Sequence, residues 1–135
     1  NPVAGTPALN LSYNYNRLTI FFNFGVTGAT AGAQTFYFDD VLFDTSGGGG
    51  GGGSSFTPIT FDSAAVTYTL TGFGGAEDAT VVADPTNASN NVARVVKSAT
   101  AELWAGTTVS TGANQSVDTI PFTATSTRMT LRILR

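Results

Sequence analysis

The side chains that could bind or transform a ligand in this chain are aromatic rings, amides and carboxylates. The 135 residues include no Cys and no His, which excludes a thiol nucleophile, a Ser-His-Asp triad and a Cys/His zinc site. Paired carboxylates can hydrolyse glycosidic bonds. However, Asp78 and Asp84 lie in turn-rich segments, where Asp is ordinary turn chemistry, and no catalytic signature surrounds them. We therefore expect a protein that is not an enzyme.

Two places along the chain offer aromatic rings that could stack on a sugar. Tyr13, Tyr15 and Arg17 lie within one short segment that also carries two Asn, and Trp104 is the only Trp. Aromatic faces stack on the apolar face of a pyranose, while amides and cations bond its hydroxyls. These four residues are the predicted ligand-binding set. The alternative is that the aromatics are core residues or cross-strand pairs, and Trp104 is expected to pack inside.

The composition is that of a β-protein with a polar but weakly charged surface. Charged residues make up 11% of the chain, against roughly 25% in a typical soluble domain, and Thr, Ser and Asn replace them. Apolar and polar residues alternate over several short segments separated by turn residues. Strands are predicted over residues 18–24, 36–43, 66–70 and 127–134, and shorter ones over residues 59–61, 80–83, 92–97, 102–104, 107–110 and 117–122. No segment carries the apolar period of a long helix.

A run of seven glycines divides the chain. Gly47 to Gly53 form the centre of a Gly/Ser segment over residues 45–55, which is typical of a flexible linker. The net charge of −3 provides no basic field for nucleic acid, and no apolar stretch approaches the roughly 20 residues of a membrane span. We expect neither nucleic acid nor membrane as a partner.

Two strings of residues on either side of the run carry a family resemblance. One comprises residues 74–76, 82–92, 96–97 and 104–108, and the other comprises residues 22–25 and 35–43. Together they resemble jelly-roll carbohydrate-binding modules appended to secreted polysaccharide-degrading enzymes of bacteria, particularly marine ones. The resemblance implies an all-β fold, an antiparallel β-sandwich of the jelly-roll type. It also implies an opening strand like residues 59–62 and a closing strand like residues 36–41.

The order of these segments departs from that of the family. Residues 1–44 look like the C-terminal strands of such a module, and residues 56–135 look like its N-terminal strands. The chain is then either a circular permutant joined by the linker or a window across a tandem array. Strands that the family has between these segments are absent. We expect a complementary fragment or a neighbouring copy to supply them, or the fold to be shortened so as to do without them.

The resemblance also points to a structural calcium ion. If the strands pair as in the family, Asp62 and either Asp39 or Asp40 come together, and Ca²⁺ prefers such clustered oxygen ligands. Strict alternation places Asp39 and Asp40 on opposite faces, so only one of the two would bind the ion. The alternative is that these acids protect a strand edge or begin a turn.

The sequence therefore predicts a secreted, non-catalytic module that holds a larger protein on a polysaccharide. The alternative is a structural β-sandwich, such as an adhesin or fibre repeat or an engineered scaffold, that binds no sugar. Exposure of aromatic rings near polar groups would favour the first function, and burial of Trp104 and the tyrosines would favour the second.

Overall fold

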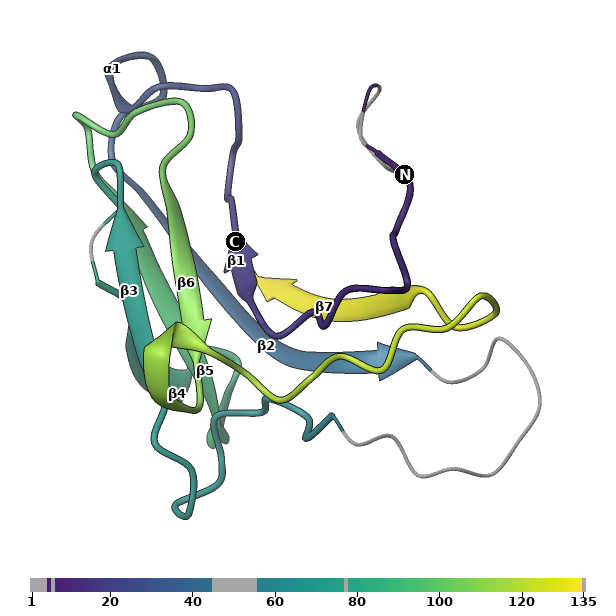
Figure 1. Ribbon diagram of the computed structural model, residues 1–135. Coiled ribbons are helices and arrows are strands. Elements are labelled where there is room, and N and C mark those ends of the chain that lie inside the picture. Colours follow the sequence, from purple (N-terminus) through teal and green to yellow (C-terminus); the bar gives the residue numbers. More distant parts are fainter. Residues whose placement is uncertain (1–4, 6, 45–55, 77, 135) are drawn as a thin grey trace.

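Two antiparallel sheets form a β-sandwich in the computed structural model, which describes residue 5 and residues 7–44, 56–76 and 78–134 (Figure 1). The first sheet has the order β1-β6-β3, with β1 at Leu18–Ile20, β6 at Gly106–Ser110 and β3 at Thr69–Phe73. The second has the order β4-β5-β2-β7, with β4 at Thr80–Asp84, β5 at Asn87–Lys97, β2 at Gln34–Asp44 and β7 at Arg128–Leu134. The predicted all-β sandwich is confirmed.

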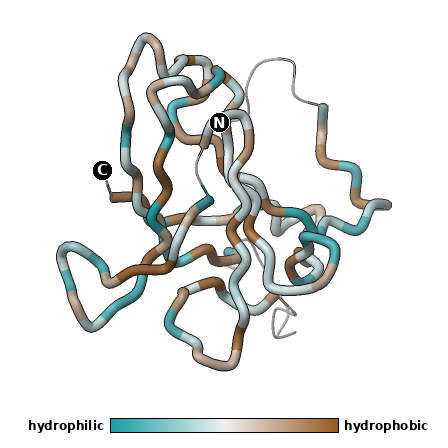
Figure 2. Tube along the Cα trace, turned by 90° about the vertical axis from the view of Figure 1, so that its left-hand side faces the viewer, coloured by the Kyte–Doolittle hydropathy of each residue, from teal (hydrophilic) through white to brown (hydrophobic). Residues whose placement is uncertain are grey.

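The core consists of the apolar side chains that face inward from both sheets. In β2, Phe36 and Phe38 are buried and stand opposite Val95 and Ala93 of β5, which are buried too. The first sheet contributes Val109 of β6, among others. Strands with this alternation bury one face and leave Thr and other polar residues on the other face. Figure 2 shows hydrophilic residues marking the outer loops.

Strands from both sides of the glycine run pair with one another. β1 pairs with β6, and β2 pairs with both β5 and β7. Val41 near the end of β2 also forms a bridge with Ile59, which lies in the expected opening segment. Residues 7–44 and 56–134 therefore contribute strands to the same two sheets. The predicted linker, residues 45–55, lies outside the described residues.

Several strand boundaries differ from the sequence prediction. The strand expected over residues 18–24 ends at Ile20, because the chain turns where Asn23 and Gly25 adopt positive φ angles of 50° and 84°. Residues 102–104 form a turn, and within residues 117–122 only Ile120 makes a bridge. These short segments alternate like strands but lie where no neighbouring strand pairs with them.

The helical content is small, as the sequence indicates. It comprises one turn of α-helix, α1 at Gly28–Ala31, and a 3₁₀ turn, η1 at Ala113–Gln115. Thr27 caps α1 by accepting a hydrogen bond from the Thr30 backbone N–H. Among the described residues, no helix is long and apolar enough to cross a membrane.

Candidate functional site

Four aromatic rings form a continuous row at one end of the three-stranded sheet. The ring of Phe24 lies 5.6 Å from that of Phe21, which lies 5.7 Å from that of Phe73, which lies 6.1 Å from that of Trp104. Phe21 directly follows β1, Phe73 ends β3, and Trp104 precedes β6. We call Phe21, Phe24, Phe73 and Trp104 the aromatic row.

Three members of the aromatic row are largely exposed. The exposed fractions are 61% for Phe24, 44% for Phe21 and 48% for Trp104. The expectation that Trp104 packs inside is therefore wrong. Residues 102–104 form a turn rather than a strand, so the indole leaves the core and stacks on Phe73 with an interplanar angle of 17°. An exposed chain of rings is uncommon in a protein this small, because large apolar side chains are normally covered.

The only lysine of the chain anchors the turn that presents two of these rings. Lys97, at the end of β5, is 3% exposed, and its Nζ donates to the carbonyl oxygens of Phe22, Asn23 and Val26 at 3.3, 3.1 and 2.9 Å. Three acceptors match the three N–H donors of an ammonium group. Lys97 thus fixes the backbone between β1 and α1, on which Phe21 and Phe24 are mounted.

Two glycines form the floor beneath the aromatic row. A Cβ added to Gly106 would lie 2.7 Å from Cζ of Phe73 and 3.0 Å from Cδ1 of Phe21. A Cβ added to Gly74, whose φ is +66°, would lie 2.8 Å from Cζ3 of Trp104. The contacts of 2.7 Å at Gly106 and 2.8 Å at Gly74 are shorter than real Cβ contacts, so the rings of Phe73 and Trp104 lie directly on the backbone at these two positions.

The segment around Tyr13 presents only one free ring. Tyr13 is 66% exposed, whereas Tyr15 is half-buried, contacts Phe122 edge-to-face and accepts a hydrogen bond from the Asn10 backbone N–H on its hydroxyl. Arg17 is exposed and donates from Nη1 to the carbonyl oxygen of Gln115 at 3.1 Å. The structure brings Tyr13 and Tyr15 together, with ring centroids 6.5 Å apart, and places them apart from the aromatic row, before β1 rather than after it.

Asp39 and Asp40 both contact the same guanidinium group. Arg132 of β7 donates from Nη2 to Asp39 at 2.8 Å and from Nε to Asp40 at 3.1 Å. Its Nη1 donates to Asp84 at 3.0 Å. Asn90 adds hydrogen bonds to Asp39 and Asp84. The expectation that Asp39 and Asp40 lie on opposite faces is therefore wrong, because Asp40 adopts a φ of 52° and the register with β7 shifts between Asp39 and Leu42. Such a β-bulge redirects a side chain.

The predicted calcium residues do not form a ligand set in this structure. The cation beside Asp39 and Asp40 is Arg132, and Asp62 instead accepts a hydrogen bond from the Asn91 backbone N–H at 2.8 Å. Within residues 5, 7–44, 56–76 and 78–134, no group of three or more His, Cys, Asp or Glu residues could hold a metal ion. Calcium binding stays a prediction, which a calcium titration against EDTA, read by the melting temperature, tests directly.

The electrostatics of the arginine cluster follow from its hydrogen bonds. The hydroxyl and backbone N–H of Thr86 donate to Asp84, and together with Arg132 they hold the pKa of Asp84 well below its usual range. Hydrogen bonds to Asp39 and Asp84 raise the pKa of Arg132. Asp84 and Arg132 therefore both stay charged over the physiological pH range, which suits a structural cluster rather than proton transfer.

Sequence reasoning missed Phe21, Phe24, Phe73 and Lys97. The sequence predicts one strand over residues 18–24 and does not single out Phe21 or Phe24 as exposed. The signals that could have found them are the Asn23 to Gly25 turn between strand and helix, and a single lysine at the end of an apolar strand.

No family model, curated protein or solved structure matches the chain.

Proposed function

We propose that this chain is a non-catalytic carbohydrate-binding module that holds a larger secreted protein on a polysaccharide. The observation that carries the proposal is the aromatic row, in which Phe21, Phe24 and Trp104 are exposed in series. The resemblance to jelly-roll carbohydrate-binding modules supports it, and so does the absence of Cys and His from the chain.

The aromatic row suits a chain of sugars better than a single small molecule. Successive sugar rings present apolar C–H faces, and the four rings of the aromatic row, of which Phe73 is half-buried, lie at successive steps of 5.6, 5.7 and 6.1 Å between centroids. Stacking of this kind needs rigid rings, because each side chain that is immobilised on binding costs entropy. Lys97 and the glycine floor supply that rigidity before the ligand arrives.

Binding through a few stacking contacts is weak for a single module. It becomes effective when several modules or several sugar repeats act together, because the later contacts form at high effective concentration. A polysaccharide provides such repeats. The proposed role is therefore retention on an insoluble or polymeric substrate, not recognition of a free monosaccharide.

The aromatic row is favoured over the Tyr13 segment as the sugar site. In that segment the hydroxyl of Tyr15 and the guanidinium of Arg17 both have partners within the protein, so Tyr13 alone offers an unobstructed ring. We keep Tyr13, Tyr15 and Arg17 as a secondary contact that a long polysaccharide could reach.

Affinity electrophoresis in gels containing soluble polysaccharides tests the proposal. The wild-type chain is expected to be retarded by at least one polysaccharide, and Trp104→Ala combined with Phe24→Ala to lose about tenfold or more in affinity. The comparison variant is Tyr13→Ala, which removes the 66% exposed ring of the secondary contact and is expected to reduce affinity much less than the double variant does. Undiminished retardation of the double variant would overturn the proposal.

A structural module that binds no sugar is the second candidate. The observation that favours it is the open side of the sandwich, where the edge strands β1 and β7 face each other without an intervening strand among the described residues. Lack of retardation by every polysaccharide in the screen, with a cooperative melt of the same sample, would favour this candidate.

A further inference from the structure

Among the described residues, one edge of β7 is unpaired. This strand lies at the end of the order β4-β5-β2-β7, and within the described part of the chain it pairs only with β2. An edge strand presents a row of backbone N–H and C=O groups that another strand can join. β7 is seven residues long, which is long enough for such an addition.

The core-facing side of β7 is incompletely covered. Met129 and Ile133 stand opposite Phe43 and Phe38 of β2, so their side chains point toward the space between the sheets. Phe38 is fully buried, yet Ile133 is 53% exposed. Ile133 is this exposed because β7 is the last strand of its sheet, so no further strand covers the side chain on that edge among the described residues.

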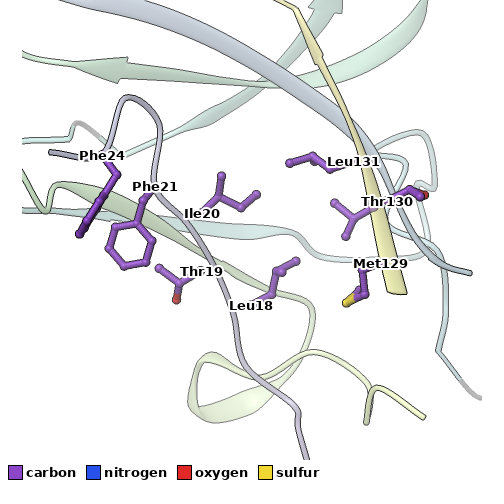
Figure 3. A pocket seen from close by; sticks show the side chains of 9 residues that line it. Leu18, Thr19, Ile20, Phe21, Phe24, Met129, Thr130 and Leu131 are labelled. Carbon is purple, nitrogen blue, oxygen red and sulfur yellow. The ribbon is translucent and has the colours of Figure 1, made fainter. Parts of the chain in front are cut away.

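An apolar groove runs between β7 and β1, the neighbouring edges of the two sheets (Figure 3). Its volume is about 680 Å³. Figure 3 shows Leu18 and Ile20 on one wall and Met129 and Leu131 on the other, with Phe21 and Phe24 at one end. Thr19 and Thr130 are its only polar lining residues. The groove therefore fits apolar side chains that project from a strand added beside β7.

The charges on β7 do not protect its edge. Natural edge strands often carry free charges, especially Lys, that repel an added strand. The two cations at Arg128 and Arg132 are instead directed to acids of their own sheet: Arg132 contacts Asp39, Asp40 and Asp84, and Arg128 lies 3.6 Å from Asp44.

The sequence of β7 is complementary to itself in one antiparallel register. Pairing centred on Leu131 places Leu131 opposite Leu131, Met129 opposite Ile133 and Thr130 opposite Arg132. Met129, Leu131 and Ile133 of both copies then share one face. A shift by two residues in one direction places Arg128 opposite Arg132, and in the other direction it places Arg132 opposite itself. Like charges directly opposite each other are destabilising, and a shift by one residue mixes the two faces.

We propose that two copies of this chain associate through β7, in the antiparallel register centred on Leu131. The two four-stranded sheets then form one continuous sheet, and the Met129, Leu131 and Ile133 side chains of each copy extend over the groove of the other. The pairing is isologous, so it closes on itself and yields a dimer rather than a fibre.

Sedimentation velocity over a range of concentrations tests the proposal. The wild-type chain is expected to approach twice its mass of 13.9 kDa. Ile133→Lys is expected to raise the dissociation constant by about tenfold or more. Because Ile133 is exposed, the melting temperature of this variant is expected to stay close to that of the wild-type chain. The matched control is Val81→Lys on β4, the other edge of the same sheet, where Val81 is 41% exposed. It is expected to leave the dimer intact.

A single introduced cysteine tests the register itself. The chain has no Cys, so Leu131→Cys creates one thiol that lies opposite its symmetry mate. Opposed Cα atoms of antiparallel strands are about 4.5–5.5 Å apart, which suits a disulfide. Leu131→Cys is expected to cross-link on oxidation and Val81→Cys is not. Three results would overturn the proposal. The wild-type chain could stay at 13.9 kDa, Val81→Lys could dissociate the dimer, or Val81→Cys alone could cross-link. A monomer would leave the groove to a strand from a different protein.

Discussion

At the scale of single residues, the Arg132 guanidinium group links β7 to two other strands of the four-stranded sheet. Its guanidinium joins Asp39, Asp40 and Asp84, which come from β2 and β4, on either side of β5. Asp39 is fully buried, and Arg132 and Asn90 donate hydrogen bonds to its Oδ2, which offset the cost of burying a polar group. Removal of one partner from such a buried cluster is costly because it leaves a charge without compensation.

We predict that Arg132→Met lowers the melting temperature by several degrees, because Asp39 loses its cation. Arg128→Met is the control on the same strand. Arg128 is exposed and its ion pair with Asp44 measures 3.6 Å, so its removal is expected to cost about a degree or less. Thermal melts followed by circular dichroism compare the two variants. Equal melting temperatures would contradict the proposed role of Arg132.

Acid is predicted to destabilise the fold through Asp84. Because the folded state lowers the pKa of this carboxyl, the folded state binds a proton less readily than the unfolded chain does. The stabilisation is fully present above the ordinary Asp pKa of about 4 and is lost as the pH falls further. Urea unfolding at pH 7 and at pH 3 should show this loss, and Asp84→Asn should show a smaller pH dependence. A pH dependence that the variant retains in full would exclude Asp84 as its source.

At the scale of elements, the turn between β1 and α1 determines how the aromatic row is presented. The alternation Leu18, Ile20, Phe22, Phe24 predicts one continuous strand, but three backbone carbonyls of this segment bind Lys97 instead of a neighbouring strand. The local pattern identifies which residues are apolar. It does not show that the chain turns after Ile20, or that a lysine more than seventy positions away in sequence donates to the carbonyl oxygens of that turn.

Gly106→Ala is predicted to disturb the aromatic row. The new Cβ would contact Phe73, Phe21 and the Ile20 carbonyl oxygen at 3.0 Å or less, so the rings must move away from β6. Trp104 is the only Trp, and its fluorescence emission is expected to shift to longer wavelength as its stacking on Phe73 loosens. Thr108→Ala, on the same strand, is the control and is expected to leave the emission unchanged. An unchanged spectrum for Gly106→Ala would contradict the floor assigned to this glycine.

At the scale of the whole molecule, the sequence predicts the fold class well and the site only in part. Alternating segments and turn residues indicate a sandwich, and the register of β2 with β5 and β7 joins strands from both sides of the glycine run. The positions of Trp104, Asp39 and Asp40 could not be predicted, because a turn and a β-bulge decide them. Both features depend on contacts between distant segments rather than on local periodicity.

The two proposals concern adjoining surfaces of the same molecule. The groove ends at Phe21 and Phe24, which also belong to the aromatic row. A dimer through β7 would therefore place two sugar sites in one particle and raise the avidity for a polymer. Sugar binding does not require the dimer, so Ile133→Lys is expected to weaken retention on a polysaccharide without abolishing it.

The most direct test of the central claim is a titration of Trp104 fluorescence with a polysaccharide that retards the wild-type chain. Because this Trp is the only one, the signal comes from the aromatic row alone. We predict a saturable shift of the emission to shorter wavelength, as the sugar covers the exposed part of the indole. A polysaccharide that binds the chain and leaves the emission of Trp104 unchanged throughout the titration would contradict the account.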